Sequence, residues 1–462
     1  MKKISVILLL VLICMQFSVC AEQAVTVTIP DYEIILNETP VYYYDSLYPF
    51  LNYKGITYFP ATFEYCKGMD LACGFDGNAF LIAYNPSYEN IPLYETAKNT
   101  KKNTAVIPSY NVIVNGKEID NTKQQYPIFN FRGVTYFPMT WDYAVNEFGW
   151  TIDFSGKIFT ITTNTSMRDD IGEKVEVDDK GIIFREYGYM EMPQPDGTVQ
   201  TIPGLIYYQA SFETGEIVRR DDYTQADEPK NTAKNEEVKL EVKDGYVYYK
   251  NQKLDGVFVE EASPDFVKPE DVEKVEYNVS MYKTENFKPL TVCKMNVYTA
   301  YSKKDGSRYG GDADYTYLLH NDEMIFLDGN TMVSNPYVMG DTMYFNTNKY
   351  WKTFSTHTLQ NKQLMKLTPD GAVVQIKDEN FNNMEIIGVA DNKLYLKCTW
   401  SPEDYIEGGE VKTSLVNDGY FTFDGEKLEK VAHYVYSTYD AVSPKGEILA
   451  INRRLGKVIK VK

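Results

Sequence analysis

Residues 48–60, YPFLNYKGITYFP, decide the fold of the first third of this chain, because residues 126–138, YPIFNFRGVTYFP, repeat them 78 positions later. A repeat at a fixed offset marks one structural unit that is built twice. In the first copy Asn52 and Gly55 enclose a short turn between two apolar runs, and the second copy keeps both residue types at the same places. Such a turn predicts a β-hairpin, since Gly readily adopts positive φ.

Each copy continues with a Gly-free segment that predicts a short helix, and it closes on an apolar run that predicts a strand. The helices are expected at 61–66 and 139–147, and the closing strands at 79–83 and 157–162. We therefore expect two small α+β modules, the first spanning residues 25–84 and the second residues 103–163.

Three short sequence motifs follow one another in the second copy, namely VNGK at 114–117, GVTYFP at 133–138 and GWTID at 149–153. In this order they resemble the copper amine oxidase N-terminal-like domain, a stalk module found in tandem on secreted and surface proteins of Gram-positive bacteria. The first copy departs from the pattern, because Glu38 stands in place of the hairpin Gly and Cys73 lies in the later strand.

The resemblance implies a structural role and no copper chemistry. In the oxidases the copper and the quinone cofactor belong to a separate catalytic domain, and this chain lacks the His-x-His pair of that domain. A copper site needs imidazole, thiolate or thioether ligands, and residues 22–163 contain no histidine. We expect both modules to bind no copper.

Residues 1–21 have the pattern of a signal peptide. Lys2 and Lys3 precede the apolar run 4–13, and Val19-Cys20-Ala21 offers a small-residue cleavage site. The apolar run is much shorter than the ~20 residues of a membrane span. Cleavage after Ala21 predicts a secreted or cell-surface protein without an integral membrane segment. Acylation of Cys20, as in a lipoprotein, is the alternative.

Composition narrows the class of protein and of partner. The chain has 462 residues and a net charge of −18, with 65 acidic against 47 basic side chains. Such a surface repels nucleic acid and anionic lipid, so we expect no nucleic-acid partner. The 39 tyrosines and 23 phenylalanines favour strands, and the fold class is therefore predicted to be mainly β.

Residues 175–462 form a second, β-rich region in the sequence. Short aromatic strands there follow Gly, Asp or Asn turns, which are hairpin signals. These turns lie at 179–181, 244–245, 340–341, 391–392, 418–419 and 445–446. Gly340, Asn392 and Gly446 lie about 50 residues apart, near the ~40 to 50 of a propeller blade, so a β-propeller of about six blades is predicted. A pair of β-sandwiches is the alternative, and the charged stretch 219–237 is expected to be a mobile insertion.

Candidate disulfides and metal ligands are few. Four cysteines follow the leader, and Cys66 with Cys73, or Cys293 with Cys398, can pair if the fold brings them together. Four free or buried thiols are the other interpretation. The isolated histidines and the absence of a Cys-x-x-Cys motif predict no metal site. The histidines are His320, His357 and His433.

Catalytic motifs are likewise missing, and no catalytic or cofactor-binding residue is assigned. The chain has no Gly-x-Ser-x-Gly elbow. Glu64 and Asp142 occupy the same place in the two copies, but each is expected on a solvated helix face. The aromatic residues 42–44, Trp351 and Trp400 can either stack against a sugar or peptide or pack in the core.

The sequence thus predicts a non-catalytic secreted or surface protein, in which the two modules present the β-rich region to an extracellular protein or glycan. The alternative is a hydrolase or lyase that acts on an extracellular polymer. The two classes differ in one feature of the β-rich region: clustered carboxylates with a histidine in one pocket would favour an enzyme.

Overall fold

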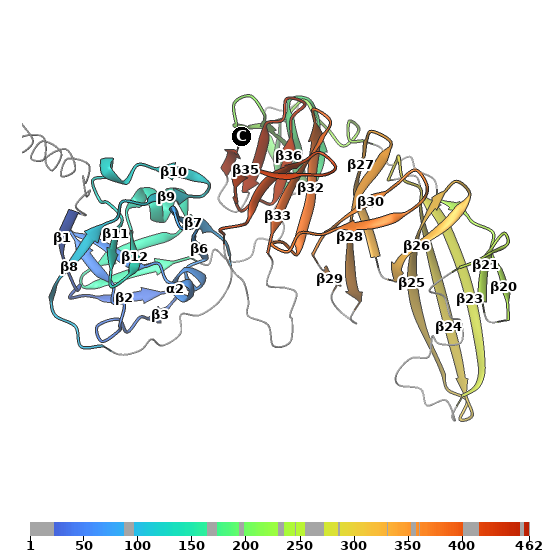
Figure 1. The fold of residues 1–462 in the computed structure, drawn as a ribbon, viewed down its shortest axis with the longest axis horizontal. Coiled ribbons are helices and arrows are strands. Elements are labelled where there is room, and N and C mark those ends of the chain that lie inside the picture. Colours follow the sequence, from blue (N-terminus) through green and yellow to red (C-terminus); the bar gives the residue numbers. More distant parts are fainter. Residues whose placement is uncertain are drawn as a thin grey trace, which may run out of the picture. The chain divides into compact units, whose positions relative to one another are not determined.

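A computed structural model describes most of the chain and divides it into two compact units. Unit 1 comprises residues 1–168 and unit 2 residues 169–462. The described residues are 23–86, 97–163, 173–193, 198–229, 235–244, 246–254, 272–284, 287–329, 331–352, 357–359, 361–400, 415–452 and 457–461. The predicted signal peptide lies outside these ranges. Strands dominate both units, so the prediction of a mainly β protein is confirmed (Figure 1).

Unit 1 contains a closed barrel to which each copy of the repeat contributes three strands. The order around the barrel is β1 (Gln23–Thr28), β4 (Leu51–Tyr53), β5 (Ile56–Pro60), β12 (Val134–Pro138), β11 (Phe129–Phe131) and β8 (Lys102–Ile107). The copies meet where β1 pairs with β8 and where β5 pairs with β12. Thr26 lies opposite its own counterpart Thr104, and Phe59 lies opposite its counterpart Phe137. The barrel therefore has the pairing of a twofold axis.

Two further sheets of unit 1 also combine both copies. One sheet has the order β10 (Lys117–Ile119), β9 (Asn111–Val114), β7 (Ala79–Tyr84) and β6 (Leu71–Phe75). The other has the order β13 (Thr151–Ser155), β14 (Ile158–Thr162), β2 (Glu33–Leu36) and β3 (Thr39–Pro40). In each sheet the closing strand of one copy runs parallel to an early strand of the other. The repeat thus builds one interlocked unit by exchanging strands.

The predicted hairpins and helices lie where the repeat indicates them. Lys54 and Gly55 have φ of 51° and 85°, and Arg132 and Gly133 have φ of 55° and 80°, the values of a tight two-residue hairpin turn. The Asn52 side chain accepts a hydrogen bond from the Gly55 amide at 3.1 Å. Helices follow in both copies, as α2 (Phe63–Gly68) and the π-helix η2 (Asp142–Glu147), and a 3-10 turn η1 (Asn121–Lys123) lies between β10 and β11.

Aromatic side chains fill the barrel of unit 1. Tyr58 stacks on Phe129 with 4.3 Å between ring centroids, and Phe129 in turn stacks on Tyr136 at 5.8 Å. All three rings are fully buried among Val, Leu and Phe side chains of both copies. Burial raises the pKa of the Tyr58 and Tyr136 hydroxyls well above their usual value, so both stay neutral.

The described residues of unit 2 form six antiparallel sheets, and most of the paired strands follow one another along the chain. The first sheet contains β15 (Glu173–Val177), β16 (Gly181–Pro193), β17 (Val199–Ser211) and β18 (Ile217–Arg219). The second contains β20 (Glu241–Lys243), β21 (Tyr246–Tyr249) and β22 (Gln252–Lys253). The third contains β19 (Glu236–Glu237), β23 (Val272–Thr284), β24 (Val292–Lys303), β25 (Arg308–His320) and β26 (Glu323–Gly329).

The last three sheets follow one another along the chain. They are β27 (Thr331–Met339), β28 (Thr342–Lys352), β30 (Gln363–Leu367) and β31 (Val373–Ile376), with β29 (His357–Leu359) beside β28; then β32 (Asn383–Ala390), β33 (Lys393–Thr399), β34 (Gly419–Phe423) and β35 (Leu428–His433); and finally β36 (Tyr439–Val442), β37 (Ile448–Asn452) and β38 (Lys457–Lys460). The predicted turns end at the first residue of a strand or within two residues before it, because Gly, Asp or Asn there supplies the turn conformation; Gly245 of the turn at 244–245 lies outside the described residues.

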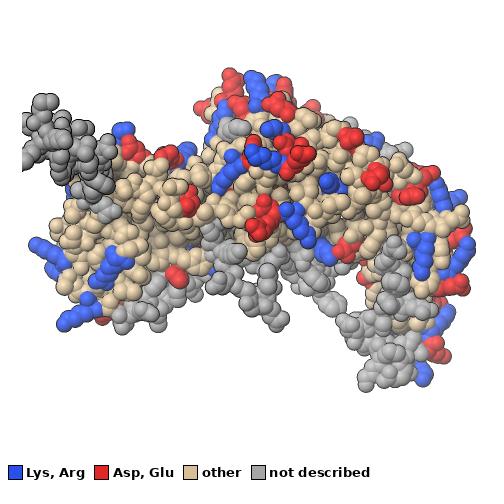
Figure 2. All heavy atoms as spheres, in the orientation of Figure 1, with Lys and Arg blue, Asp and Glu red and all other residues tan. Residues whose placement is uncertain are grey.

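From the β20–β22 sheet onward, successive sheets of unit 2 share apolar cores. Buried clusters join the β20–β22 sheet to the β23–β26 sheet, that sheet to the β27–β31 sheet, and so on to β32–β35 and β36–β38. A further cluster, with Phe184 and Leu449, joins the last sheet to the first, β15–β18. On the face of unit 2 in Figure 2, basic and acidic side chains are interspersed.

One expectation for unit 2 is wrong in part. The charged stretch 219–237 was expected to be a mobile insertion, yet residues 219–229 are described and packed. Tyr223 is buried against Tyr207, with 5.1 Å between ring centroids, and Glu228 binds Arg185 at 2.6 Å. A charged sequence is therefore anchored here by one aromatic ring and a specific ion pair, two features that its composition does not reveal.

Candidate ligand-binding pocket

A cavity of about 630 Å3 lies in unit 2, where four sheets bring their first strands together. Its walls include Lys174 and Val177 of β15, Asn335 and Tyr337 of β27, Asn383 and residues 385 to 389 of β32, Tyr439, Asp440 and Val442 of β36, and also Lys397 and Thr399 of β33 with Tyr434, Ser437 and Thr438. Sites for small molecules usually measure about 300–1,000 Å3. The cavity is therefore large enough for a ligand of a few rings.

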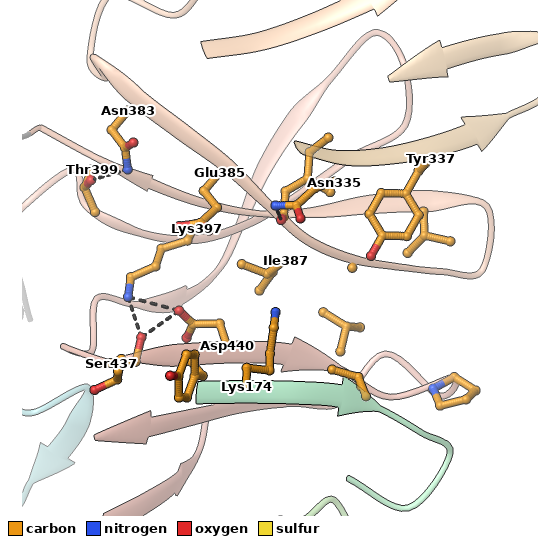
Figure 3. A pocket seen from close by; sticks show the side chains of 18 of the residues that line it. Lys174, Asn335, Tyr337, Asn383, Glu385, Ile387, Lys397, Thr399, Ser437 and Asp440 are labelled. Atoms are coloured by element: carbon orange, nitrogen blue, oxygen red, sulfur yellow. Dashed lines mark hydrogen bonds and ion pairs between the residues drawn. The ribbon is translucent and has the colours of Figure 1, made fainter. Parts of the chain in front are cut away.

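A buried ion pair forms one wall of the cavity. The Lys397 ammonium donates to the Asp440 carboxylate at 3.1 Å and to Ser437 Oγ at 2.5 Å, and Ser437 Oγ donates to Asp440 at 2.6 Å (Figure 3). The side chains of Lys397 and Asp440 are only 10% and 7% exposed. Tyr420 donates a further hydrogen bond to Asp440 at 2.7 Å. Both charges are thus compensated within the protein.

The contacts of Ser437, Lys397 and Asp440 favour a structural role over a catalytic one. A serine nucleophile needs a neighbouring base that can accept its proton. Here Lys397 is paired with a carboxylate and donates to Ser437, and the Ser437 proton points to Asp440. The network links β33, β36 and the segment between β35 and β36. It fixes the shape of the cavity.

A second ion pair and an amide contact define the wall that β32 forms. Glu385 pairs with Lys362, and both side chains are about one third exposed. The Asn383 side chain donates to Thr399 Oγ1 at 3.0 Å and accepts from the Lys362 amide at 2.8 Å. The charge of Glu385 is therefore also balanced by a neighbour.

Lys174 differs from the other charged residues of the cavity. Its side chain rises from β15 into the space below β32, with its ammonium directed toward Ile387 and Asn335 (Figure 3). Solvent reaches it through the open cavity, but the protein around it desolvates the ammonium and lowers its pKa; Glu385 and Asp440 partly oppose this effect. Among the residues that the structure describes, none forms an ion pair with Lys174.

The residues singled out from the sequence lie elsewhere. Tyr42 is exposed, whereas Tyr43 is buried in unit 1, donates to the Tyr32 carbonyl at 2.5 Å and stacks on Tyr44 with 4.4 Å between ring centroids. Trp400 is half-buried in unit 2, and its backbone amide donates to Asp418 at 3.0 Å. The side chain of Trp351 lies outside the described residues. Glu64 and Asp142 belong to α2 and η2 in unit 1 and are exposed, as expected.

The cysteines and histidines form no shared site in the described part of the chain. Cys66, Cys73, Cys293 and Cys398 are all free thiols. Burial and contact with Cys73 raise the pKa of the Cys66 thiol, while Cys293 and Cys398 belong to different core clusters. His320 contacts the Pro369 carbonyl at 3.2 Å, and His433 is half-buried on β35. No group of three or more possible metal ligands occurs among the described side chains.

Sequence reasoning missed the cavity because its residues come from distant segments. One signal was present: Lys397 interrupts the apolar strand KLYLKCT, and Asp440 interrupts YDAV. A charge in a strand that is otherwise buried usually has a partner, since an isolated charge is costly to bury. That these two side chains meet between two separate sheets could not be predicted from the sequence.

No family model, no curated protein and no solved structure matches this chain. The resemblance of residues 25–163 to the stalk module accordingly stays a prediction. Within the described residues, no helix is both long and apolar enough to span a membrane.

Proposed function

We propose that this protein is a non-catalytic, secreted or cell-surface binding protein whose unit 2 recognises an extracellular ligand through the cavity beside Lys174. The observation that carries the proposal is that four sheets, separate in sequence, place their first strands around one polar cavity of about 630 Å3. Its amides, hydroxyls and one solvent-accessible ammonium suit binding by hydrogen bonds. Unit 1 would serve as the structural module that presents unit 2.

A propeller-like arrangement of unit 2 is part of this proposal. In a propeller the sheets follow one another around an axis, and ligands often bind near that axis. From the β20–β22 sheet onward the sheets of unit 2 pack in series, the last on the first, and β15, β27, β32 and β36 each open their sheet and line the cavity. The shared position of four first strands at one cavity favours a propeller-like arrangement over a pair of sandwiches, whereas no core cluster of the described residues joins the first sheet to the β20–β22 sheet.

The enzymatic alternative has less support. Four carboxylates line the cavity, at Asp178, Asp179, Glu385 and Asp440, but its lining includes no histidine. Asp440 and Glu385 are held in ion pairs, and Asp178 accepts from the Gly181 amide at 2.8 Å. General acid–base catalysis needs a group free to exchange a proton with a substrate. Binding without turnover agrees better with these contacts.

The proposal is tested with the mature protein on an array of glycans and peptidoglycan fragments. We expect a discrete set of ligands whose binding is lost when Thr438→Trp fills the mouth of the cavity. Thr201→Trp, at an exposed position of β17 outside the cavity lining, is the matched control and should bind as the wild type does. Equal binding by both variants, or release of shortened products during incubation, would contradict a non-catalytic site at this cavity.

A further inference from the structure

The charges around the cavity balance one another in pairs, apart from Lys174 and the carboxylates at the rim. Lys397 is compensated by Asp440, and Glu385 by Lys362. Asp178 accepts hydrogen bonds from the Lys180 and Gly181 amides, each at 2.8 Å, so its carboxylate is held by its own turn. Within the described part of the cavity, Lys174 is the cation without an ion-pair partner.

The position of Lys174 points to a ligand group, because its ammonium is directed into a polar cavity and has no ion-pair partner among the described residues. An anionic group of a ligand, placed between β15 and β32, would pair with this ammonium and would be held by a charge-assisted hydrogen bond. The neighbouring Asn335 amide and the Thr399 hydroxyl could then bind neutral polar groups of the same ligand.

The surrounding carboxylates limit the charge that such a ligand can carry. Glu385 and Asp440 both act on Lys174, and Asp178 and Asp179 line the same cavity. Carboxylates repel a second negative charge in a partly desolvated site. A group with a single negative charge matches Lys174, whereas a phosphate monoester, which carries close to two charges at neutral pH, does not.

We propose that Lys174 binds the carboxylate of an acidic saccharide, such as a glycan with a uronic acid, while the amides and hydroxyls of the cavity bind its neutral hydroxyls. This inference rests on the proposed binding function and names its ligand class. Lys174 acts here as the group that selects an acidic over a neutral sugar.

The test uses the mature protein with glucuronic acid, glucose and glucose 6-phosphate as probes. Titration calorimetry or ligand-observed NMR measures the binding of each probe. The wild type should bind glucuronic acid more tightly than glucose. Lys174→Met keeps most of the apolar stem and removes the charge, so it should weaken glucuronic acid binding on the order of tenfold or more and leave glucose unchanged. Lys174→Arg should retain most of the affinity.

Lys243→Met is the matched control, because Lys243 is an exposed lysine on β20 outside the cavity lining. It should bind all three probes as the wild type does. Equal binding of glucuronic acid and glucose, unaffected by Lys174→Met but abolished by Thr438→Trp, would overturn the acidic ligand and keep the binding site. Tighter binding of glucose 6-phosphate than of glucuronic acid would contradict the inference that the ligand group carries a single negative charge. Binding of no saccharide by the wild type would overturn this inference, while a non-saccharide ligand on the array would still support the proposed function.

Discussion

The two units bury different kinds of side chain, although both are built from strands. The barrel of unit 1 has a core of apolar and aromatic residues from both copies of the repeat, and its tyrosine hydroxyls stay neutral. Unit 2 stacks sheets made of neighbouring strands, and it buries ionisable groups between them, such as Lys397 with Asp440. The stability of unit 1 should therefore depend on turns and packing, whereas that of unit 2 should depend on charge and on pH.

The largest expected effect concerns the buried ion pair. Asp440→Asn removes the negative partner and leaves the Lys397 ammonium almost inaccessible to water, so the free energy of unfolding of unit 2 should fall by about 3–5 kcal/mol. Chemical denaturation followed by fluorescence measures this loss. The exposed pair between Lys427 and Glu429 is the control, and Glu429→Gln there should leave the free energy of unfolding nearly unchanged. Equal effects at both sites would mean that unit 2 does not depend on its buried charges.

The second prediction is that the stability of unit 2 depends on pH through Asp418. Burial raises the pKa of its carboxyl from 3.8 to about 7. The folded state therefore keeps a proton that the unfolded state loses, and stability falls as the pH rises from about 4 to about 7. Asp418→Asn removes this penalty and should stabilise unit 2 by up to about 3–4 kcal/mol at pH 8.

At pH 4 the same substitution should have little effect, because Asp418 is then protonated in the folded state and Asn can still accept the hydrogen bond of the Trp400 amide. Denaturation curves at both pH values measure the difference. Unit 1 serves as the internal reference, and its transition should hardly move between them. A stabilisation by Asp418→Asn that is the same at both pH values would contradict the raised pKa.

The stability of unit 1 should depend on the backbone conformation of a hairpin turn and not on pH. Gly133 has φ of +80°, and a Cβ atom added there would meet no atom within 4 Å. Gly133→Val should therefore destabilise unit 1 by roughly 1–3 kcal/mol through backbone strain alone. Gly133→Asn should cost much less, since Asn tolerates positive φ. Calorimetry would contradict this explanation if both substitutions lowered the melting temperature equally.

The smallest expected effect comes from exchanging the residue at one equivalent turn between the two copies of the repeat. Glu38 has φ of +65°, where the second copy has Gly116 with φ of +79°. Glu38→Gly removes the strain of a non-Gly residue in this conformation and should stabilise unit 1 by about 0.5–1 kcal/mol. The reciprocal Gly116→Glu should destabilise it by a similar amount. Thermal melts of the two variants measure both changes, and changes of the same sign would refute the symmetry of the two turns.

Local features of the fold could be predicted from the sequence, but long-range pairings could not. The turns at Gly55 and Gly133 were identified because φ above zero restricts the residue type. The exchange of strands was not, because Phe59 and Phe137 are equivalent residues and present the same local pattern whether they pair within a copy or between copies. The cavity was missed for a related reason. Lys174 and Asp440 come together only through the packing of the last sheet on the first.

The twofold pairing of unit 1 also relates the two copies as the subunits of a dimer are related. Thr26 meets Thr104 and Phe59 meets Phe137 as equivalent residues meet across the axis of a symmetric dimer. A chain with one copy would supply three barrel strands and would need a second chain to close the barrel. The present unit thus holds within one chain the pairing that a symmetric dimer would build from two. Because both halves belong to one chain, they need not be identical, and Glu38 stands where the second copy has Gly116.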